Sequence, residues 1–433
     1  MSDAPSAPRY RDADPDEGVA VETLEPQGQS GEVSAGRPYL QLVLVLGALI
    51  ALGPLTIDMY LPAFPAIAEE LSASDSAVQL TLTGMLGGLA FGQLVIGPLS
   101  DAFGRKKPLM IGVVMHAVAS VLCAIAPSIA VLSAVRILQG FAGAAISVVA
   151  MAIVRDLFSG VAVARLMSRL MLVIGLAPIL APSIGGLVLE WTTWRGIFGV
   201  LAAAAVLLVV VAALGIRETL PRSRRRPADL RSTLATYRSI LRDHTFVALV
   251  LIGGLMLSAL FAYVAGSSFV LQDGYDLDER TFGLVFGANA VGLTVASQLN
   301  PMLIHRFSVV NVLSGAMVTG ALSATALLVA GLTGWLGLAG VLVPLAFVVA
   351  SCGLSLPNTP ALALTRHGEA AGTAAALLGS VQFGVGAIVA PLVGLSGSTS
   401  VVPMGAAMLG VTLLASALMF GVVRRDETAM SFG

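Results

Sequence analysis

From Leu40 to about residue 423 the chain is a succession of apolar stretches, separated by short polar segments. A helix needs about 20 apolar residues to cross a hydrocarbon core about 30 Å thick, and backbone polar groups there must be satisfied internally. Charged residues make up only 11% of the chain, too few to cover a soluble globule of this length. The sequence therefore predicts an all-α integral membrane protein. We place twelve transmembrane helices at 40–61, 77–99, 108–127, 129–154, 168–189, 196–216, 245–271, 281–302, 310–332, 336–357, 371–396 and 401–423.

The basic residues alternate along this predicted topology. If the N-terminus is cytoplasmic, 21 of the 24 Lys and Arg residues fall in the tails or at cytoplasmic loops, the exceptions being Arg136, Arg195 and Arg280. Cytoplasmic loops of membrane proteins carry such an excess. The pattern predicts a multi-pass protein of the cytoplasmic (inner) membrane with both termini in the cytoplasm.

One long polar segment, 217–243, divides the twelve spans into two six-helix bundles at 39–216 and 244–423. We interpret this segment as a basic cytoplasmic linker that lies on the inner membrane surface, with a solvated tether as an equal alternative. Residues 1–38 are acidic and contain Pro, Gly and Ser, which predicts a disordered cytoplasmic tail, and residues 424–433 form a second tail. Six plus six spans around a basic loop is typical of two-bundle secondary transporters.

The run GPLSDAFGRKK occupies positions 97–107, between the second and third spans. Glycines permit a tight turn, Asp101 can accept hydrogen bonds from helix-end amides, and Arg105 can pair with a carboxylate. The run resembles the signature loop of the major facilitator superfamily, which latches the two bundles on the cytoplasmic side when the transporter faces outward. The resemblance implies a conformational latch made of Gly97, Asp101, Gly104, Arg105 and Asp156, beneath spans 2, 4 and 11. An ordinary basic turn is the alternative.

Arg136 and Asp58 are charged residues inside predicted spans. An arginine there costs about 2.5–3.5 kcal/mol, so we expect Arg136 to face a polar cavity with a partner, unless it snorkels to the outer surface. The run Arg136-Ile-Leu-Gln139-Gly140 resembles the fourth helix of the same superfamily, whose arginine is tied to proton coupling. Asp58 could exchange a proton near neutral pH, or could be an interfacial residue before Pro62. We predict that Asp58 and Arg136 face one cavity and form the proton-coupling pair.

The predicted fifth span carries the run LAPILAPSIGG, which includes Pro178, Pro182, Gly185 and Gly186. Two prolines four residues apart bend a helix, and paired glycines let another backbone approach. The run resembles the fifth-helix motif of drug/proton antiporters, although Ala181 stands where its usual core has glycine. A purely structural kink is the alternative.

Longer runs narrow the resemblance to the bicyclomycin/chloramphenicol resistance (Bcr/CflA) branch of these antiporters. They include IDMYLPAFPAIAEEL at 57–71, VRDLF at 154–158 and WRGIF at 194–198, and the similarity continues to about residue 423. The resemblance implies proton-coupled efflux of small antibiotics, chloramphenicol-like, bicyclomycin-like or of several classes, by alternating access. The expected partners are the drug, protons and the lipid bilayer, with no cofactor beyond the proton gradient. We expect a monomer, and the net charge of −1 indicates no nucleic-acid partner.

An uncharged or zwitterionic drug needs a few oriented polar groups in an apolar wall. The predicted substrate contacts are polar or aromatic residues in otherwise apolar spans: Tyr60, Gln139, Asn289, Gln382 and Phe383. Each could equally serve helix–helix packing. Transport of an endogenous metabolite (a sugar, an amino acid or a secondary metabolite) is the alternative function. The spans hold no Asp/Asp or metal-ligand set at helical spacing, and we predict no enzyme, no catalytic residue and no metal site.

Overall fold

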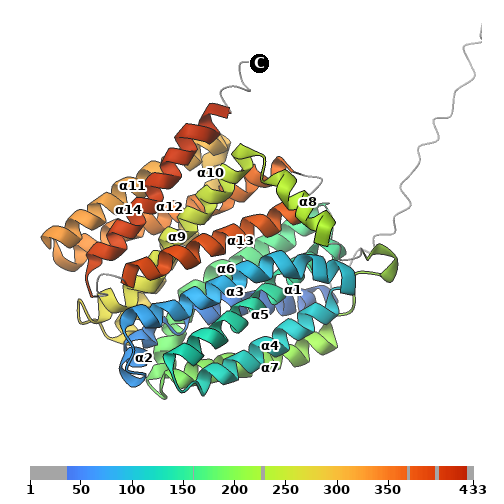
Figure 1. Cartoon of the computed structure of the whole chain (residues 1–433), viewed down its shortest axis with the longest axis horizontal. Coiled ribbons are helices and arrows are strands. Elements are labelled where there is room, and N and C mark those ends of the chain that lie inside the picture. The colour runs from blue at the N-terminus through green and yellow to red at the C-terminus, as the bar shows by residue number, and fades with distance from the viewer. Residues whose placement is uncertain (1–36, 159, 226–229, 368–370, 395–398, 427–433) are drawn as a thin grey trace, which may run out of the picture.

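The computed structural model describes residues 37–158, 160–225, 230–367, 371–394 and 399–426, and these contain no β-strand (Figure 1). Most of the predicted tails, 1–36 and 427–433, therefore lie outside the described residues. The helices are α1 (Arg37–Asp58), α2 (Phe64–Glu70), α3 (Asp75–Phe103), α4 (Lys106–Ala124), α5 (Ile129–Leu157), α6 (Gly160–Leu189), α7 (Trp194–Gly215), α8 (Leu230–Ile240), α9 (His244–Gln272), α10 (Glu279–Arg306), α11 (Val309–Thr333), α12 (Gly337–Thr365), α13 (Ala371–Val389) and α14 (Val401–Leu418). Four short helical turns accompany them: η1 (Leu61–Ala63), η2 (Arg222–Arg224), η4 (Ala390–Gly394) and η5 (Met419–Val423).

The predicted twelve-helix membrane fold is confirmed. Eleven of the described helical segments are long and apolar enough to cross a membrane. The twelfth is α6, a helix of 30 residues that contains the apolar stretch Gly175–Leu189.

Several helices begin before the apolar runs that predicted them. Their first turns are capped by side chains that accept hydrogen bonds from backbone amides, as Ser74 does for Ala77 and Asp278 does for Thr281. Such caps satisfy amides that have no partner inside the helix, so the helix can start in the polar loop. Boundaries taken from hydropathy alone are therefore too short at these ends.

The two halves of the chain form two bundles with the same order of helix contacts (Figure 1). In the first bundle α3 packs on α5, α5 on α4, α4 on α7 and α1 on α6. The second bundle repeats this order with α10 on α12, α12 on α11, α11 on α14 and α9 on α13. The bundles meet where α3 lies along α13 and α6 lies along α10.

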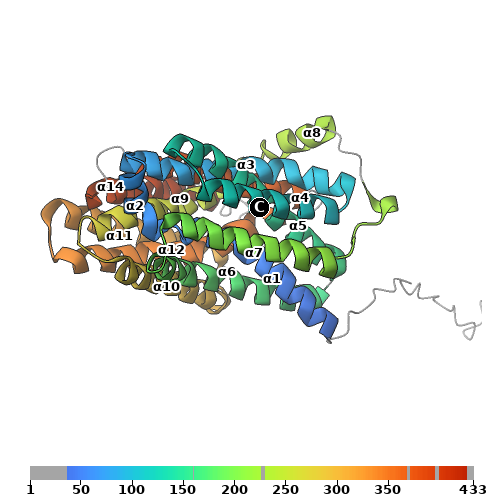
Figure 2. The ribbon, with the colours of Figure 1, turned by 90° about the horizontal axis from the view of Figure 1, so that it is seen from below.

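The linker after α7 defines one end of the molecule, which we call the linker end. There the amphipathic helix α8 lies beside the bundles (Figure 2). It contacts α13, and Tyr237 donates a hydrogen bond to the Leu94 carbonyl over 3.3 Å. The opposite end carries α2 and the α9–α10 connection, and we call it the far end.

Hydrogen bonds between the bundles close the far end. The donors are hydroxyl and amide side chains, and the acceptors are backbone carbonyls near helix ends: Ser76 to Gly394 (2.6 Å), Ser268 to Leu61 (2.7 Å) and Gln272 to Pro62 (3.2 Å). These bonds hold the two bundles together at this end.

Candidate transport site

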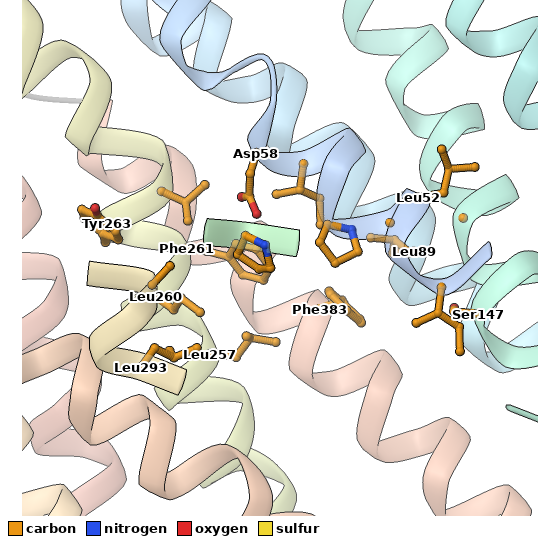
Figure 3. A pocket seen from close by; sticks show the side chains of 18 of the residues that line it. Leu52, Asp58, Leu89, Ser147, Leu257, Leu260, Phe261, Tyr263, Leu293 and Phe383 are labelled. Carbon is orange, nitrogen blue, oxygen red and sulfur yellow. The ribbon is translucent and has the colours of Figure 1, made fainter. Parts of the chain in front are cut away.

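A cavity of about 320 Å³ lies between the two bundles (Figure 3). This size is at the lower end of the range for drug-sized ligands. Its wall consists mostly of Leu, Ile, Val, Phe and Pro side chains from both bundles. The polar or titratable residues that line it are Asp58, His116, Ser147 and Tyr263. The cavity is therefore suited to an apolar molecule that makes only a few polar contacts.

Asp58 is the last residue of α1, and in Figure 3 its carboxyl group extends into the space between the bundles. Only 5% of the residue is exposed. Within the described part of the chain its side chain makes no hydrogen bond or ion pair. An unpartnered carboxylate in apolar surroundings is costly, so this site favours a proton or a cationic group on Asp58.

Arg136 does not line the cavity, and the expectation that it faces the cavity together with Asp58 is not met. It is fully buried (0% exposed) inside the first bundle, which also excludes snorkelling. Its guanidinium donates to the Thr56 carbonyl (3.1 Å) and lies 4.2 Å from the centroid of the Tyr60 ring. Thr56 and Asp58 are two residues apart and so lie on nearly opposite sides of α1. Arg136 is consequently on the bundle side of α1, and Asp58 is on the cavity side.

Only one of the five predicted substrate contacts, Phe383, lines the cavity in this structure. Tyr60 and Gln139 face Arg136 inside the first bundle. Asn289 donates to the Tyr263 hydroxyl (3.1 Å) and so supports a lining residue from behind. Gln382 is not among the lining residues. Polar groups in the hydrocarbon region satisfy one another, which turns several of them away from the central space.

Sequence reasoning missed the lining residues His116, Ser147 and Tyr263. The signal that singled out Tyr60 and Asn289, a polar or aromatic residue in an apolar span, applies equally to Tyr263 and His116. It could have found them, but it does not say which way a helix turns.

The predicted antiporter motif brings α6 close to both bundles. Pro178 lines the cavity, and a Cβ at Gly283 of α10 would lie 3.3 Å from the Pro182 carbonyl oxygen. A Cβ at Gly186 would lie 3.2 Å from the Glu279 carbonyl oxygen, and one at Gly185 would clash with the Met59 carbonyl. The small residues thus permit backbone contact of α6 with the α1–α2 connection and with α10.

We expect Gly185→Val to destabilise the protein by about 1–3 kcal/mol, because a side chain there must push α6 away from Met59. The measurement is the thermal unfolding midpoint in detergent, together with the yield of monodisperse protein. Gly199→Val is the matched control, since a Cβ at Gly199 meets nothing within 4 Å. Equal midpoints for the two variants would show that the close approach at Gly185 is unimportant.

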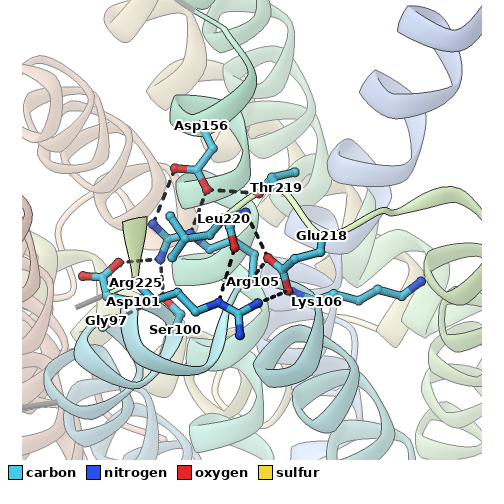
Figure 4. Close-up of polar contacts among 10 residues, drawn as sticks. All are labelled: Gly97, Ser100, Asp101, Arg105, Lys106, Asp156, Glu218, Thr219, Leu220 and Arg225. Carbon is cyan, nitrogen blue, oxygen red and sulfur yellow. Dashed lines mark hydrogen bonds and ion pairs between the residues drawn. The ribbon is translucent and has the colours of Figure 1, made fainter. Parts of the chain in front are cut away.

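Arg105 is the centre of a charge cluster at the linker end (Figure 4). Its guanidinium binds Asp101 (2.5 Å), Asp156 (2.8 Å) and the Ser100 hydroxyl (2.8 Å). The structure thus brings Asp101, Arg105 and Asp156 together. Gly97 accepts a hydrogen bond from the Ser100 hydroxyl through its carbonyl. Burial of Arg105 opposes its charge, but the hydrogen bonds and charges of Asp156 and Asp101 raise its pKa above the ordinary value.

Glu218, which follows α7, is a member of this cluster that the sequence did not reveal. Its carboxylate accepts from the backbone amides of Arg105 (2.8 Å) and Lys106 (3.3 Å) and pairs with Arg225 at 3.7 Å. Gly104 has φ +89°, and a Cβ there would collide with this carboxylate. We expected the cluster beneath span 11 as well, but the described contacts of Arg105 are with α3, with Asp156 of α5 and with Glu218 after α7. The carboxylate of Glu218, brought in by the end of α7, supplies the remaining contact.

Partial burial by itself would raise the pKa of the Glu218 carboxyl. Hydrogen bonds from the backbone amides of Arg105, Leu220 and Lys106, together with the charge of Arg225, outweigh the effect of burial. The pKa of Glu218 is therefore lower than its ordinary value. The stabilisation that the Glu218 carboxylate gives to the 97–107 loop is therefore fully present at pH values above the ordinary glutamate pKa. It is lost as the pH falls through the lowered pKa of Glu218.

The sequence model of the Major Facilitator Superfamily matches residues 46–391. The chain belongs to this superfamily. A Bacillus subtilis (strain 168) protein named uncharacterized MFS-type transporter YdgK is 41% identical over 395 residues, which cover 90% of this chain and 97% of that protein. A bicyclomycin resistance protein homolog of Haemophilus influenzae is 34% identical and covers 84% of this chain and 91% of its own length. The multidrug resistance protein MdtL of Salmonella heidelberg is 29% identical over 60% of this chain and 65% of its own.

Solved transporter structures share the fold. The xylose transporter XylE from E. coli, in a partially occluded inward-open conformation, superposes with a TM-score of 0.69 at 16% identity, covering 89% of this chain and 97% of its own. A POT family transporter superposes with a TM-score of 0.71 at 12% identity, covering 90% and 96%. Identities this low show the fold alone. The chain is a multi-pass membrane transporter of this superfamily, and its similarity to bicyclomycin and multidrug resistance proteins agrees with the predicted resemblance.

Proposed function

We propose that this transporter exports small antibiotics, chloramphenicol-like or bicyclomycin-like, across the cytoplasmic membrane in exchange for protons. The observation that carries the proposal is Asp58, the only carboxylate among the described residues that line the apolar cavity between the bundles. A group that gains and loses a proton at the substrate cavity is what coupling requires. The names of the relatives, bicyclomycin resistance and multidrug resistance, support the choice of substrate class.

The energy source in this proposal is inward proton flow. Each inward proton supplies about 2.3 kcal/mol per 100 mV of membrane potential, and no cofactor is needed. Asp58 takes up a proton when the cavity opens at the far end and releases it when the cavity opens at the linker end. Drug binding favours the unprotonated form, so that one cavity serves the drug and the proton alternately. Arg136, on the bundle side of α1, affects the proton affinity of Asp58 but does not itself bind or release the proton.

The proposed orientation places the linker end and both termini in the cytoplasm. The basic residues of the linker and of the 97–107 loop support it, because cytoplasmic segments carry the excess of Lys and Arg. The far end, where hydrogen bonds join the bundles, then faces outward. The latch residues of the linker end stabilise the outward-facing state, and the transporter works as a monomer.

Drug uptake into everted vesicles from an efflux-deficient host tests the proposal. Respiration acidifies the vesicle interior, so we expect labelled chloramphenicol to accumulate and to leak out when a protonophore is added. Unlabelled antibiotics should compete, while sugars and amino acids should not. Accumulation that persists with the protonophore would exclude proton coupling. Competition by a sugar or an amino acid instead of the antibiotics would favour a metabolite transporter.

A further inference from the structure

A closed ring of polar contacts joins α1, α4 and α5 on the bundle side of the cavity. Arg136 binds the Gln139 oxygen (2.7 Å), and the Gln139 amide nitrogen donates to the Ser120 hydroxyl (2.8 Å). Ser120 lies 3.4 Å from Nδ1 of His116, whose Nε2 lies 3.0 Å from the Thr56 hydroxyl. Arg136 closes the ring through the Thr56 carbonyl (3.1 Å). Thr56 is therefore held at two atoms.

The donor directions in this ring define the state of His116. The Thr56 hydroxyl gives its proton to the Leu52 carbonyl at 2.6 Å, so its oxygen must accept from His116. His116 consequently carries its hydrogen on Nε2. Its other nitrogen lies 3.4 Å from the Ser120 oxygen, but the Ser120 proton goes to the His116 carbonyl at 2.8 Å, so this contact carries no hydrogen bond.

His116 lines the cavity, yet its two nitrogens are directed at Thr56 and Ser120 of the first bundle. The polar contact of its Nε2 is with the Thr56 hydroxyl.

Thr56 lies in the last turn of α1, where backbone carbonyls run out of partners within the helix. Arg136 satisfies one of these carbonyls and brings a positive charge to the negative end of the helix. His116 holds the side chain of the same residue. Asp58, two residues further on, is the terminal residue of the helix, so its direction depends on how this turn is held.

We propose that His116 is a positioning residue for Asp58 and acts on it through Thr56. The proposal rests on the role of Asp58 in the proposed function. When either contact to Thr56 is lost, the end of α1 is released, and the surroundings of the Asp58 carboxyl change. The proton affinity of Asp58 then changes, although neither altered side chain forms a hydrogen bond with Asp58.

Other titratable or charged groups lie on the elements packed around the end of α1. They are Tyr60 on the α1–α2 connection, Cys123 on α4, Arg136 on α5, Tyr263 on α9, and Glu279 and Arg280 on α10. Tyr263 shares the cavity with Asp58. All of them are unchanged in the variants below, so a shift in titration reports the contacts of Thr56.

The test is an infrared titration of the Asp58 carboxyl in detergent-purified full-length protein, with pH as the only variable. Asp58→Asn identifies the band by removing it. Thr56→Val removes the hydroxyl at nearly constant shape, and Thr56→Ser keeps the hydroxyl. His116→Leu removes both nitrogens, and His116→Gln keeps a donor near the position of Nε2. We expect Thr56→Val and His116→Leu to move the titration midpoint by about 1 pH unit, and Thr56→Ser and His116→Gln to stay within about 0.3.

A wild-type midpoint in both Thr56→Val and His116→Leu would overturn the proposal, even if both variants melt at a lower temperature. Equal shifts in each variant and its conservative partner would overturn it as well, because the hydrogen bonds would then not be the cause. If Thr56→Val does not fold, the His116 pair decides. The titration uses no drug, so it tests the role of His116 alone. The efflux proposal is tested separately by the vesicle assay.

Discussion

Asp58→Asn should reduce chloramphenicol accumulation in energised everted vesicles at least about tenfold, which corresponds to about 1.4 kcal/mol or more of lost coupling. Asparagine has the shape of a protonated aspartate but cannot release a proton. The variant should therefore still bind drug, with an affinity that no longer depends on pH, and should fail to move it against a gradient. Drug binding and uptake measured on the same preparation separate these two outcomes.

The matched control for this variant is Asp276→Asn. Asp276 is exposed at the far end and has φ +55°, a conformation that asparagine adopts readily. It should transport normally. If Asp58→Asn accumulates drug as well as the control does, proton coupling resides at another residue.

Arg105→Ala should abolish most transport while the protein still reaches the membrane. The substitution leaves Asp156, whose side chain is only 17% exposed, without its cation. Losing a charged hydrogen-bond partner at such a site costs about 1–3 kcal/mol. In the proposed cycle this cost falls on the outward-facing state, so the conformational equilibrium shifts and turnover falls. Vesicle uptake, normalised to the amount of transporter by immunoblotting, is the measurement.

Two related variants sharpen the result for Arg105. Arg105→Lys keeps the charge but loses the planar fork that reaches Asp101 and Asp156 together, so we expect only partial recovery. Asp101→Asn should cut transport less than Arg105→Ala, because the Asp101 side chain is half exposed. Full transport by Arg105→Ala at normal protein levels would show that the cluster has no part in the cycle.

Both predictions depend on the same feature of the architecture. The cavity with Asp58 lies at the interface of the bundles, while the Arg105 cluster lies at the linker end of the first bundle. A rocking movement of one bundle against the other changes access to the cavity. The cluster can influence this movement without contacting the substrate.

The sequence by itself determined the membrane-spanning helices, their grouping into two sets of six and the residues of the 97–107 loop. These features are local: hydropathy decides which segments enter the bilayer, and Asp101 and Arg105 pair because they are only four residues apart in the chain. Proximity of Asp156 also followed from the topology, because the loop and the end of the fourth span must lie at the same membrane surface.

Only the tertiary structure decided which way each helix faces. Hydropathy places Asp58 and Thr56 at the same depth, but it does not say that Asp58 faces the cavity and Thr56 faces Arg136. Neighbouring residues in a helix are rotated by about 100°, and spans rich in Leu, Val and Ala on every side carry no periodicity that reveals their rotation. The places of His116 and Glu218 depend on contacts between distant segments, over 60 residues to Thr56 and 113 residues to Arg105. Polar groups in a membrane choose partners across helices because the lipid offers none, and that choice is made only when the helices pack together.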